Sequence, residues 1–163
     1  MPPHSIVFTT FDSTRDRRLL GWSEFRQALF TARQIGNEAR ALLPPAPHPD
    51  CPGATVWRLL APNNRELGRS WAVYASRDEA VRHIDLLRVQ AKGLAVIGLR
   101  GSHSSQYGWI AATSGRAVLT TGRWFGAPST GYQSASAALA ALPGAVLVRP
   151  GVHSLVRERV VSL

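Results

Sequence analysis

Two small groups of residues in this chain are close enough in sequence to be considered for chemistry. The first is His48 and Cys51, which lie three positions apart in a proline-rich stretch with Asp50 between them. A structural zinc site needs four ligands at characteristic spacings, and the sequence offers no second pair of this kind. We therefore interpret these residues as incidental, and the sequence predicts no bound metal and no other cofactor.

The second group is His103 with Ser104 and Ser105, in the segment R-G-S-H-S-S. Adjacent residues on a Gly/Ser-rich loop do not make a catalytic triad, because the base must be oriented by a third group. The sequence also lacks the G-x-S-x-G, P-loop and G-x-G-x-x-G motifs. The segment is interpreted as a connector, and we predict a protein that is not an enzyme.

The charge of the chain is unusual. Its 163 residues include 19 Lys and Arg against 10 Asp and Glu, a formal net charge of +9, and every basic residue except Lys92 is arginine. Such an excess favours a polyanionic partner, either a nucleic acid or an acidic protein surface. A genome rich in G and C explains why the cations are arginines, but it does not explain their excess.

Arginines and tryptophans supply the candidate nucleic-acid-binding residues. A basic cluster follows the first expected strand and can contact phosphates without reading sequence, or simply keep the surface solvated. Two tryptophans at strand ends beside arginines can stack on bases or serve in packing. The candidates are Arg15, Arg17, Arg18, Arg69, Trp71, Arg123 and Trp124. The other two tryptophans of the second half, Trp57 and Trp109, lie on apolar strand faces and are expected in the core.

The N-terminal third predicts a strand, a helix and a linker. Residues 5–11 are rich in β-branched and aromatic residues, which is typical of a strand. Ser23 is expected to cap a helix that runs to about Leu43 and is stopped by the prolines that follow. Residues 44–54 contain too many prolines for a regular element and predict a stiff linker.

The rest of the chain repeats itself. Trp57 begins W-R-L-L-A-P-N-N and is followed by G-R-S-W, while Trp109 begins W-I-A-A-T-S-G and is followed by T-G-R-W. Matching Tyr74 with Tyr132 then requires a six-residue insertion around residues 125–130. A period near fifty residues indicates two duplicated units that pack on each other.

Each unit predicts the same order of elements. In the first we expect strands at 57–61 and 67–74, a helix whose Ser76 and Glu79 form a capping box and which ends near Lys92–Gly93, and a buried strand at 94–99. In the second we expect strands at 109–113 and 117–124, a helix capped by Ser134 and ended by Pro143–Gly144, and a strand at 145–148.

The first repeat resembles that of the YegP-like proteins, a family of small bacterial and archaeal proteins. The resemblance rests on W-R-L-L-A-P-N-N, Ser70, Tyr74, Ser76 and Ala80, and it covers about 57–99 and, more weakly, 107–148. Asn64 stands where the family usually has Gly, and Thr113 replaces an alanine. The resemblance implies β-β-β-α-β units that join in one antiparallel sheet and exchange their C-terminal strands. It implies no activity.

The sequence thus predicts an α+β fold with two tandem β-β-β-α-β repeats in a shared antiparallel sheet, plus an N-terminal strand–helix arm. The expected boundaries are 1–43 for the arm, 44–54 for the linker, 55–151 for the body with repeats at about 55–100 and 107–150, and 152–163 for a tail. The start of the chain shows no signal peptide, and the lone Cys51 excludes an internal disulfide. A cytoplasmic protein with no membrane partner is expected.

For function, we predict a non-enzymatic interaction module that docks on an anionic partner such as RNA or a ribonucleoprotein. Two alternatives stay open at this point. One is a small-molecule-binding protein, or an enzyme, with a site between the repeats. The other is a structural or assembly protein, for which a homo-oligomer is an open alternative.

Overall fold

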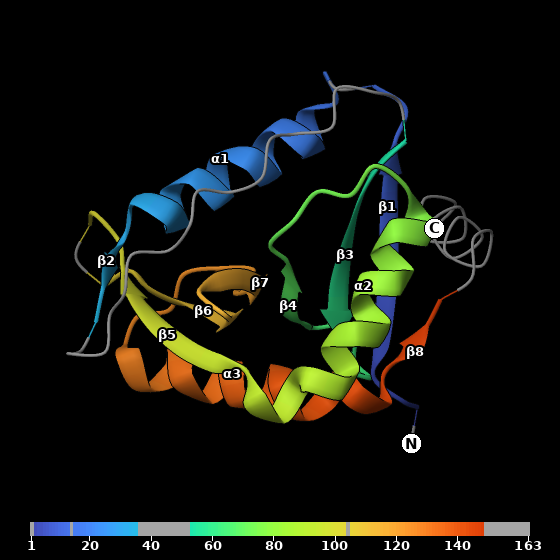
Figure 1. Ribbon diagram of the computed structural model, residues 1–163. Helices are drawn as coiled ribbons and strands as arrows, with labels where there is room; N and C mark the ends of the chain where they lie inside the picture. Colours follow the sequence, from blue (N-terminus) through green and yellow to red (C-terminus); the bar gives the residue numbers. More distant parts are fainter. Residues whose placement is uncertain (1, 14, 36–52, 104, 149–163) are drawn as a thin grey trace.

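A computed structural model describes residues 2–13, 15–35, 53–103 and 105–148, and these form an α+β protein with one mixed sheet of eight strands and three α-helices (Figure 1). The strands are β1 (Ser5–Phe11), β2 (Arg33–Gln34), β3 (Ala54–Leu60), β4 (Glu66–Ser70), β5 (Ala95–Arg100), β6 (Tyr107–Thr113), β7 (Arg116–Thr120) and β8 (Val146–Leu147). The α-helices are α1 (Arg17–Thr31), α2 (Arg77–Gln90) and α3 (Pro128–Ala141), and short 3-10 helices, Ala91–Gly93 and Leu142–Gly144, follow α2 and α3. Among the described residues, none of the helices combines the length and the apolar character that crossing a membrane requires.

The sheet has the strand order β2-β5-β6-β7-β4-β3-β1-β8. Helix α1 lies across one face, and α2 and α3 cover the other (Figure 1). The predicted first strand is confirmed as β1, which pairs antiparallel with β3 from Ser5 opposite Leu60 to Phe11 opposite Ala54. The N-terminal strand is therefore continuous with the sheet of the rest of the chain.

The predicted start of the first helix is wrong. Helix α1 begins at Arg17, and its N-cap is Asp16, whose carboxylate accepts a hydrogen bond from the backbone N–H of Arg18 at 2.9 Å. Ser23 lies inside the helix, where its hydroxyl donates to the carbonyl of Leu19 at 3.0 Å. An aspartate is as good an N-cap as a serine, so the earlier of the two caps begins the helix.

The C-terminal half of that helix and the linker mostly lie outside the described residues. The predicted end of the helix near Leu43 is also wrong, because α1 ends at Thr31, the backbone is extended at Ala32, and β2 follows directly. Positions 36–43 of the expected helix, 44–52 of the linker and the whole 152–163 tail are not among the described residues. The last linker position, Ala54, is already the first residue of β3.

From β3 onward, two runs of elements have the same order, and all but their last strands match in length. The first unit is β3, β4, α2 and β5, and the second is β6, β7, α3 and β8. The opening strands have seven residues each, the return strands five, and α2 and α3 fourteen. The expected third strand of each unit is only an isolated bridge, Thr55 with Tyr74 in the first unit and Tyr107 with Phe125 in the second.

The predicted start of the last helix is also wrong. Helix α3 begins at Pro128 after the N-cap Ala127, six positions before the Ser134 that we expected as its cap. The residue that occupies the bridge position of Tyr74 is Phe125, and Tyr132 lies within the helix. The inferred six-residue insertion therefore does not exist. A proline at the first helical position favours this start, because its fixed φ suits the first turn and its missing N–H has no intrahelical role.

The strand after each helix pairs in the other unit's half of the sheet. β5 pairs antiparallel with β6, and β8 pairs with β1, the neighbour of β3. The resemblance implies a sheet that is antiparallel throughout. The pairing of β8 with β1 is parallel, so the sheet is mixed and this expectation is wrong.

The core lies on both faces of the sheet. Trp57 and Trp109 are fully buried on the face covered by α2 and α3, as predicted. The intervening residues of the same strands point to the other face, where Val56 and Ile110 pack in the layer beneath α1. Period-two alternation in β3 and β6 thus builds two apolar layers with one set of strands.

Candidate functional site

Four residues on adjacent backbone segments form one line across the sheet. Arg33 on β2 is opposite Arg100 on β5, Arg100 is opposite Tyr107 on β6, and Tyr107 is opposite Phe125 in the isolated bridge. Residues directly opposite each other in an antiparallel pair point to the same face. We call Arg33, Arg100, Tyr107 and Phe125 the cross-strand row.

Strand alternation identifies the face to which this row belongs. Trp109, two residues along β6 from Tyr107, is buried with α3, so Tyr107 lies on the same face. Phe125 packs, partly buried, against the same apolar cluster. The row sits just beyond the start of α3, because Gly98, two residues before Arg100, lies directly beneath the side chain of Tyr132.

The two arginines of the row are a like-charge pair. Arg33 and Arg100 are both exposed and directly opposite each other, an arrangement that destabilises a sheet unless another charge compensates it. Within the described part of the chain, the ion pairs are Arg18 with Asp16 and Arg69 with Glu66, and neither involves the row. A bound anion at this end of the sheet would therefore offset the repulsion between Arg33 and Arg100.

The aromatic end of the row has a third arginine. The guanidinium of Arg123 lies over the ring of Phe125, 4.8 Å from its centroid. The backbone there is fixed: the N–H of Tyr107 donates to the carbonyl of Phe125 at 2.9 Å, and the N–H of Phe125 donates back at 2.7 Å. The ring positions are thus set by the sheet and not by a free loop.

A shallow hollow of about 190 Å³ continues from Phe125 between β4 and α3. Its polar lining includes Arg65, Arg123, Thr130 and Gln133. Glu66 also borders it, but its carboxylate is engaged by Arg69. The hollow therefore presents two exposed arginines, Arg65 and Arg123, and a carboxylate that is already paired with Arg69.

A sequence signal for this region was present and was missed. The segment from Leu86 to Arg157 contains no Asp or Glu, although it holds seven of the 19 basic residues. It supplies α3 and four of the eight strands, β5 to β8, and none of these elements carries a carboxylate. Net charge counted over the whole chain conceals this segregation, whereas a count along the sequence shows it.

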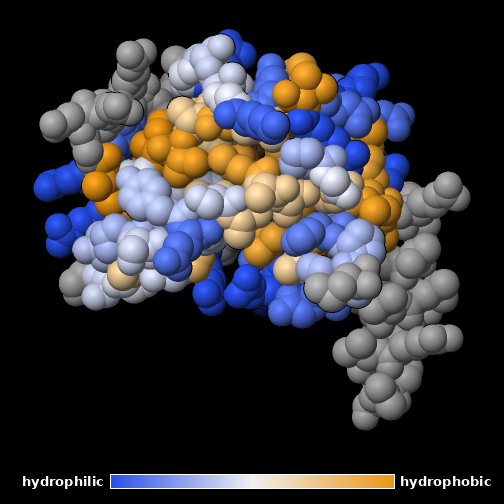
Figure 2. All heavy atoms as spheres, turned by 90° about the horizontal axis from the view of Figure 1, so that it is seen from below, coloured by the Kyte–Doolittle hydropathy of each residue, from blue (hydrophilic) through white to orange (hydrophobic). Residues whose placement is uncertain are grey.

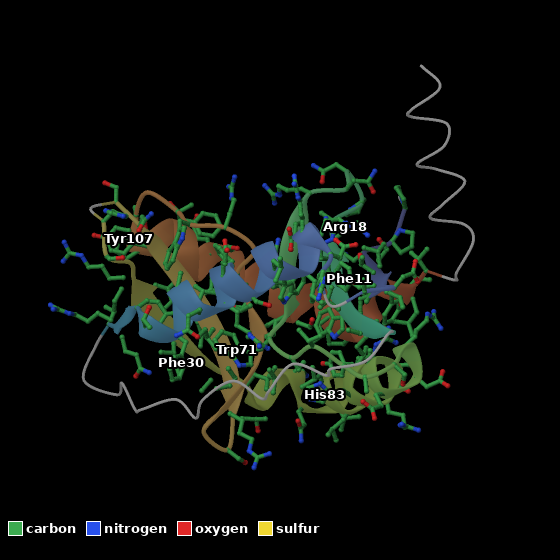
Figure 3. The ribbon with its side chains drawn as sticks, turned by 90° about the horizontal axis from the view of Figure 1, so that it is seen from above. Phe11, Arg18, Phe30, Trp71, His83 and Tyr107 are labelled. Carbon is green, nitrogen blue, oxygen red and sulfur yellow. The ribbon has the colours of Figure 1, made fainter. Side chains whose placement is uncertain are left out.

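The predicted basic cluster lies elsewhere. Arg15, Arg17 and Arg18 are exposed at the N-terminal end of α1, while β2 follows its C-terminal end, and a fifteen-residue helix separates them by about 22 Å. Figure 3 shows Arg18 and Phe11 at one end of the molecule and Tyr107 at the other. Arg18 is partly engaged by Asp16, and its hydrogen bonds hold the pKa of that carboxyl below its ordinary value.

Two of the other predicted residues, Arg69 and Trp71, make contacts within the protein. Arg69 makes a two-pronged contact with Glu66, at 2.7 and 2.9 Å, and its guanidinium lies 4.4 Å from the ring centroid of Trp22. Trp71 is only 4% exposed beneath α1, with its carbonyl accepting a hydrogen bond from buried Arg26 at 3.1 Å. A buried ring cannot stack on a base, so Trp71 is corrected to a core residue.

The last two predicted residues lie next to each other on opposite faces of the sheet. Trp124 is half-buried on the α1 side and packs at a tilt against Phe25, with ring centroids 5.8 Å apart. Arg123 is exposed on the α3 side, over Phe125. Of the residues named from sequence, Arg123 alone therefore adjoins the cross-strand row.

A buried series of hydrogen bonds links Trp57, Tyr74 and His83, and the last two are residue types that serve in acid–base chemistry. The indole N–H of Trp57 donates to the hydroxyl of Tyr74 at 3.3 Å, and that hydroxyl contacts Nδ1 of His83. Burial raises the pKa of Tyr74 and lowers the pKa of His83, so both groups are neutral near pH 7. Tyr74 and His83 line neither the hollow beside Phe125 nor the one lined by Arg33 and Arg100, and Tyr74 packs in the apolar core.

The other sequence candidates show no site. Ser102, His103 and Ser105 are exposed, while Ser104, His48 and Cys51 lie outside the described residues. Within the described ranges no three His, Cys, Asp or Glu side chains gather as metal ligands would.

The face formed by α2 and α3 has a different character. Hydrophobic atoms cover much of its middle, and hydrophilic residues surround them (Figure 2). Leu86 and Val89 of α2 are exposed by 53% and 86%. This apolar area does not fit an anionic partner.

Comparison with known family models, with curated proteins and with solved structures finds no match for this chain.

Proposed function

We propose that this protein is a non-enzymatic interaction module that docks on an anionic partner through the cross-strand row. The observation that carries the proposal is the exposed, directly opposed pair Arg33 and Arg100, at one end of a sheet whose β5–β7 region holds no carboxylate. A bound anion removes the repulsion that this pair otherwise imposes on the sheet edge.

The arrangement favours an extended polyanion over a single small anion. Arg33, Arg100 and Arg123 are spread along the row and its end, so several charges are contacted together. Contacts of this type release counterions from a polyanion such as RNA and give binding that weakens steeply with salt.

A small-molecule site is less well supported. A hollow of about 400 Å³ is lined by Arg33, Arg100 and Ser102 and has a mainly polar lining. The hollow beside Phe125, at about 190 Å³, is smaller than the 300–1,000 Å³ that is usual for ligand pockets. It also opens onto the row, which makes it an extension of the proposed docking surface.

The proposal includes the architecture that the YegP-like resemblance implies. We take the two units to be duplicated copies that exchange their last strands. Their matched element lengths and the pairing of β5 with β6 and of β8 with β1 support this.

The test is fluorescence anisotropy with labelled RNA and labelled heparin at increasing salt. The variant carries Arg33→Ala and Arg100→Ala, and the matched control carries Arg15→Ala and Arg17→Ala, which removes the same charge at the other end of α1. We expect the first variant to weaken binding of both polyanions and to reduce the salt slope by about one per arginine. The control should lose less affinity. A control that loses as much as the variant would place the interface at α1.

A further inference from the structure

We infer that the anionic partner is a single-stranded nucleic acid, whose bases stack at Tyr107 and Phe125 while its phosphates lie along Arg33, Arg100 and Arg123. This inference rests on the proposed function and adds the class of the partner. It is carried by the order of residue types along the row, cation, cation, aromatic, aromatic, and by the arginine at its end.

The spacing of the row suits a strand lying across the sheet. Its four residues stand on four adjacent backbone segments, and neighbouring strands are about 4.8 Å apart, so the row is about 14 Å long. A surface of this length contacts a few nucleotides. It is too short and too flat to enclose a duplex.

The two aromatic residues have no role in binding a polyanion that lacks bases. Tyr107 and Phe125 are both half-buried. Phe125 packs against the apolar cluster below α3, and the guanidinium of Arg123 lies over its ring. Their backbones exchange two hydrogen bonds, so the two residues are held side by side on the sheet before any ligand arrives. A fixed, partly exposed aromatic surface flanked by arginines matches the way single strands are bound, by base stacking next to phosphate contacts.

Stacking also distinguishes a single strand from a duplex. Paired bases are covered above and below by their neighbours, so a ring on a sheet surface cannot reach their faces. Unpaired bases can turn toward the ring, and every base has a face that stacks. The row therefore favours unpaired RNA or DNA over a duplex, with little preference for sequence.

The bound nucleic acid can extend from Phe125 into the adjoining hollow. Arg65, Thr130 and Gln133 line it and offer donors for a further phosphate or sugar. Arg123 stands between the ring of Phe125 and this hollow, since it both lies over the ring and lines the hollow.

The experiment compares three labelled probes: a single-stranded oligouridine, an RNA duplex of the same length, and heparin, which is a polyanion without bases. The variants are Tyr107→Leu and Phe125→Leu, which keep an apolar side chain below α3 but remove the flat ring. The control is Phe8→Leu, because Phe8 on β1 also has an arginine over its ring, Arg77 at 4.5 Å, but lies at the far side of the sheet.

We expect tighter binding to the oligouridine than to the duplex, and a loss of about 5- to 150-fold in oligouridine affinity for Tyr107→Leu. Heparin affinity should stay unchanged in that variant, and Phe8→Leu should alter neither. If the folded Tyr107→Leu and Phe125→Leu proteins bind oligouridine like the parent, or the duplex binds as tightly, the inference fails while docking on an anion stands. If none of the three probes binds, both fail.

A second measurement does not depend on the folding of a variant. Photocrosslinking of the unaltered protein to bromouridine-labelled RNA, followed by peptide mapping, should place the crosslink in the peptides that contain Tyr107 or Phe125. Crosslinks confined to the Arg15–Arg18 region would overturn the inference.

Discussion

The hydroxyl of Tyr74 shares a hydrogen bond with Nδ1 of His83 and accepts one from the indole N–H of Trp57. In the second unit, the buried indole N–H is bonded through one residue fewer. Its bridge residue is Phe125, which has no hydroxyl, and the indole N–H of Trp109 instead donates directly to Ser134 at 3.2 Å. His83 and Ser134 are both the seventh residue of their helices, so equivalent places serve the two buried tryptophans.

Protonation of His83 should destabilise the protein. Burial lowers the pKa of His83 below its ordinary 6.5, so in the folded protein it binds its proton less readily than in the unfolded chain. The free energy of unfolding is therefore fully present above pH 6.5 and falls as pH drops below it, until the lowered folded pKa is passed.

Urea unfolding across this pH range checks the prediction. His83→Gln still offers Tyr74 an acceptor but cannot take up a proton there, so its stability should change less with pH than that of the parent. Parallel profiles for the two proteins would contradict it.

Much of the fold was predictable from local patterns in the sequence. The strand at β1, the alternating strands around Trp57 and Trp109, and the Ser76 cap, which accepts from the N–H of Glu79 at 3.2 Å, are all found as expected. Each depends on residues within one element, where periodicity and capping chemistry act directly.

The errors came from matching residue types between the two units. Tyr132 was matched with Tyr74, which displaced the expected N-cap of α3 by seven residues, from Ala127 to Ser134, although the residue at the place of Tyr74 is Phe125. Both units have an aromatic residue at that bridge, Tyr74 and Phe125. Only Tyr74 has a hydroxyl, and the place of its partner His83 is taken by Ser134 in the second unit.

The candidate site was less predictable, because it is made across strands. Arg33 and Arg100 are far apart in sequence and meet only through the pairing of β2 with β5. Nothing local marks either arginine, whereas Trp71, which looked exposed at a strand end, is covered by α1.

Loss of β8 should weaken the first unit's half of the sheet. The N–H groups of Val146 and Val148 donate to the carbonyls of His4 and Ile6, both at 2.9 Å, and Arg77 of α2 donates to the carbonyl of Val148 at 3.2 Å. A chain ending after Gly144 loses all three bonds and uncovers the edge of β1. Hydrogen exchange should then show reduced protection in β1 and β3.

A chain that ends after Val148 is the matched control, since it keeps β8. Its protection in β1 and β3 should equal that of the full chain. Unchanged protection at Trp57 in the shorter variant would show that β8 does not support this half of the sheet.

Two glycines of the sheet, Gly68 on β4 and Gly98 on β5, should respond differently to alanine. A Cβ at Gly68 would lie 3.2 Å from the carbonyl oxygen of Thr120 and 3.2 Å from the indole of Trp109, and neither buried group can move away. Gly68→Ala should therefore reduce the free energy of unfolding by about 1–3 kcal/mol.

A Cβ at Gly98 would meet the hydroxyl end of Tyr132. That side chain is 41% exposed and can rotate into solvent, so Gly98→Ala should cost less than Gly68→Ala. Thermal unfolding of the two variants gives the comparison, and a larger loss for Gly98→Ala would contradict this account of the packing.

The hydrogen bond between Trp109 and Ser134 should contribute to the stability of the second unit. Trp109 is fully buried, and its indole N–H donates to the hydroxyl of Ser134. Ser134→Ala leaves that N–H buried without its acceptor, and an unsatisfied buried donor costs about 1–3 kcal/mol. Ser136→Ala is the matched control, because Ser136 is exposed on the same helix and its replacement should change stability by no more than about 0.5 kcal/mol. Urea unfolding monitored by tryptophan fluorescence measures both, and equal stabilities for the two variants would show that the Trp109–Ser134 bond does not hold α3 on the sheet.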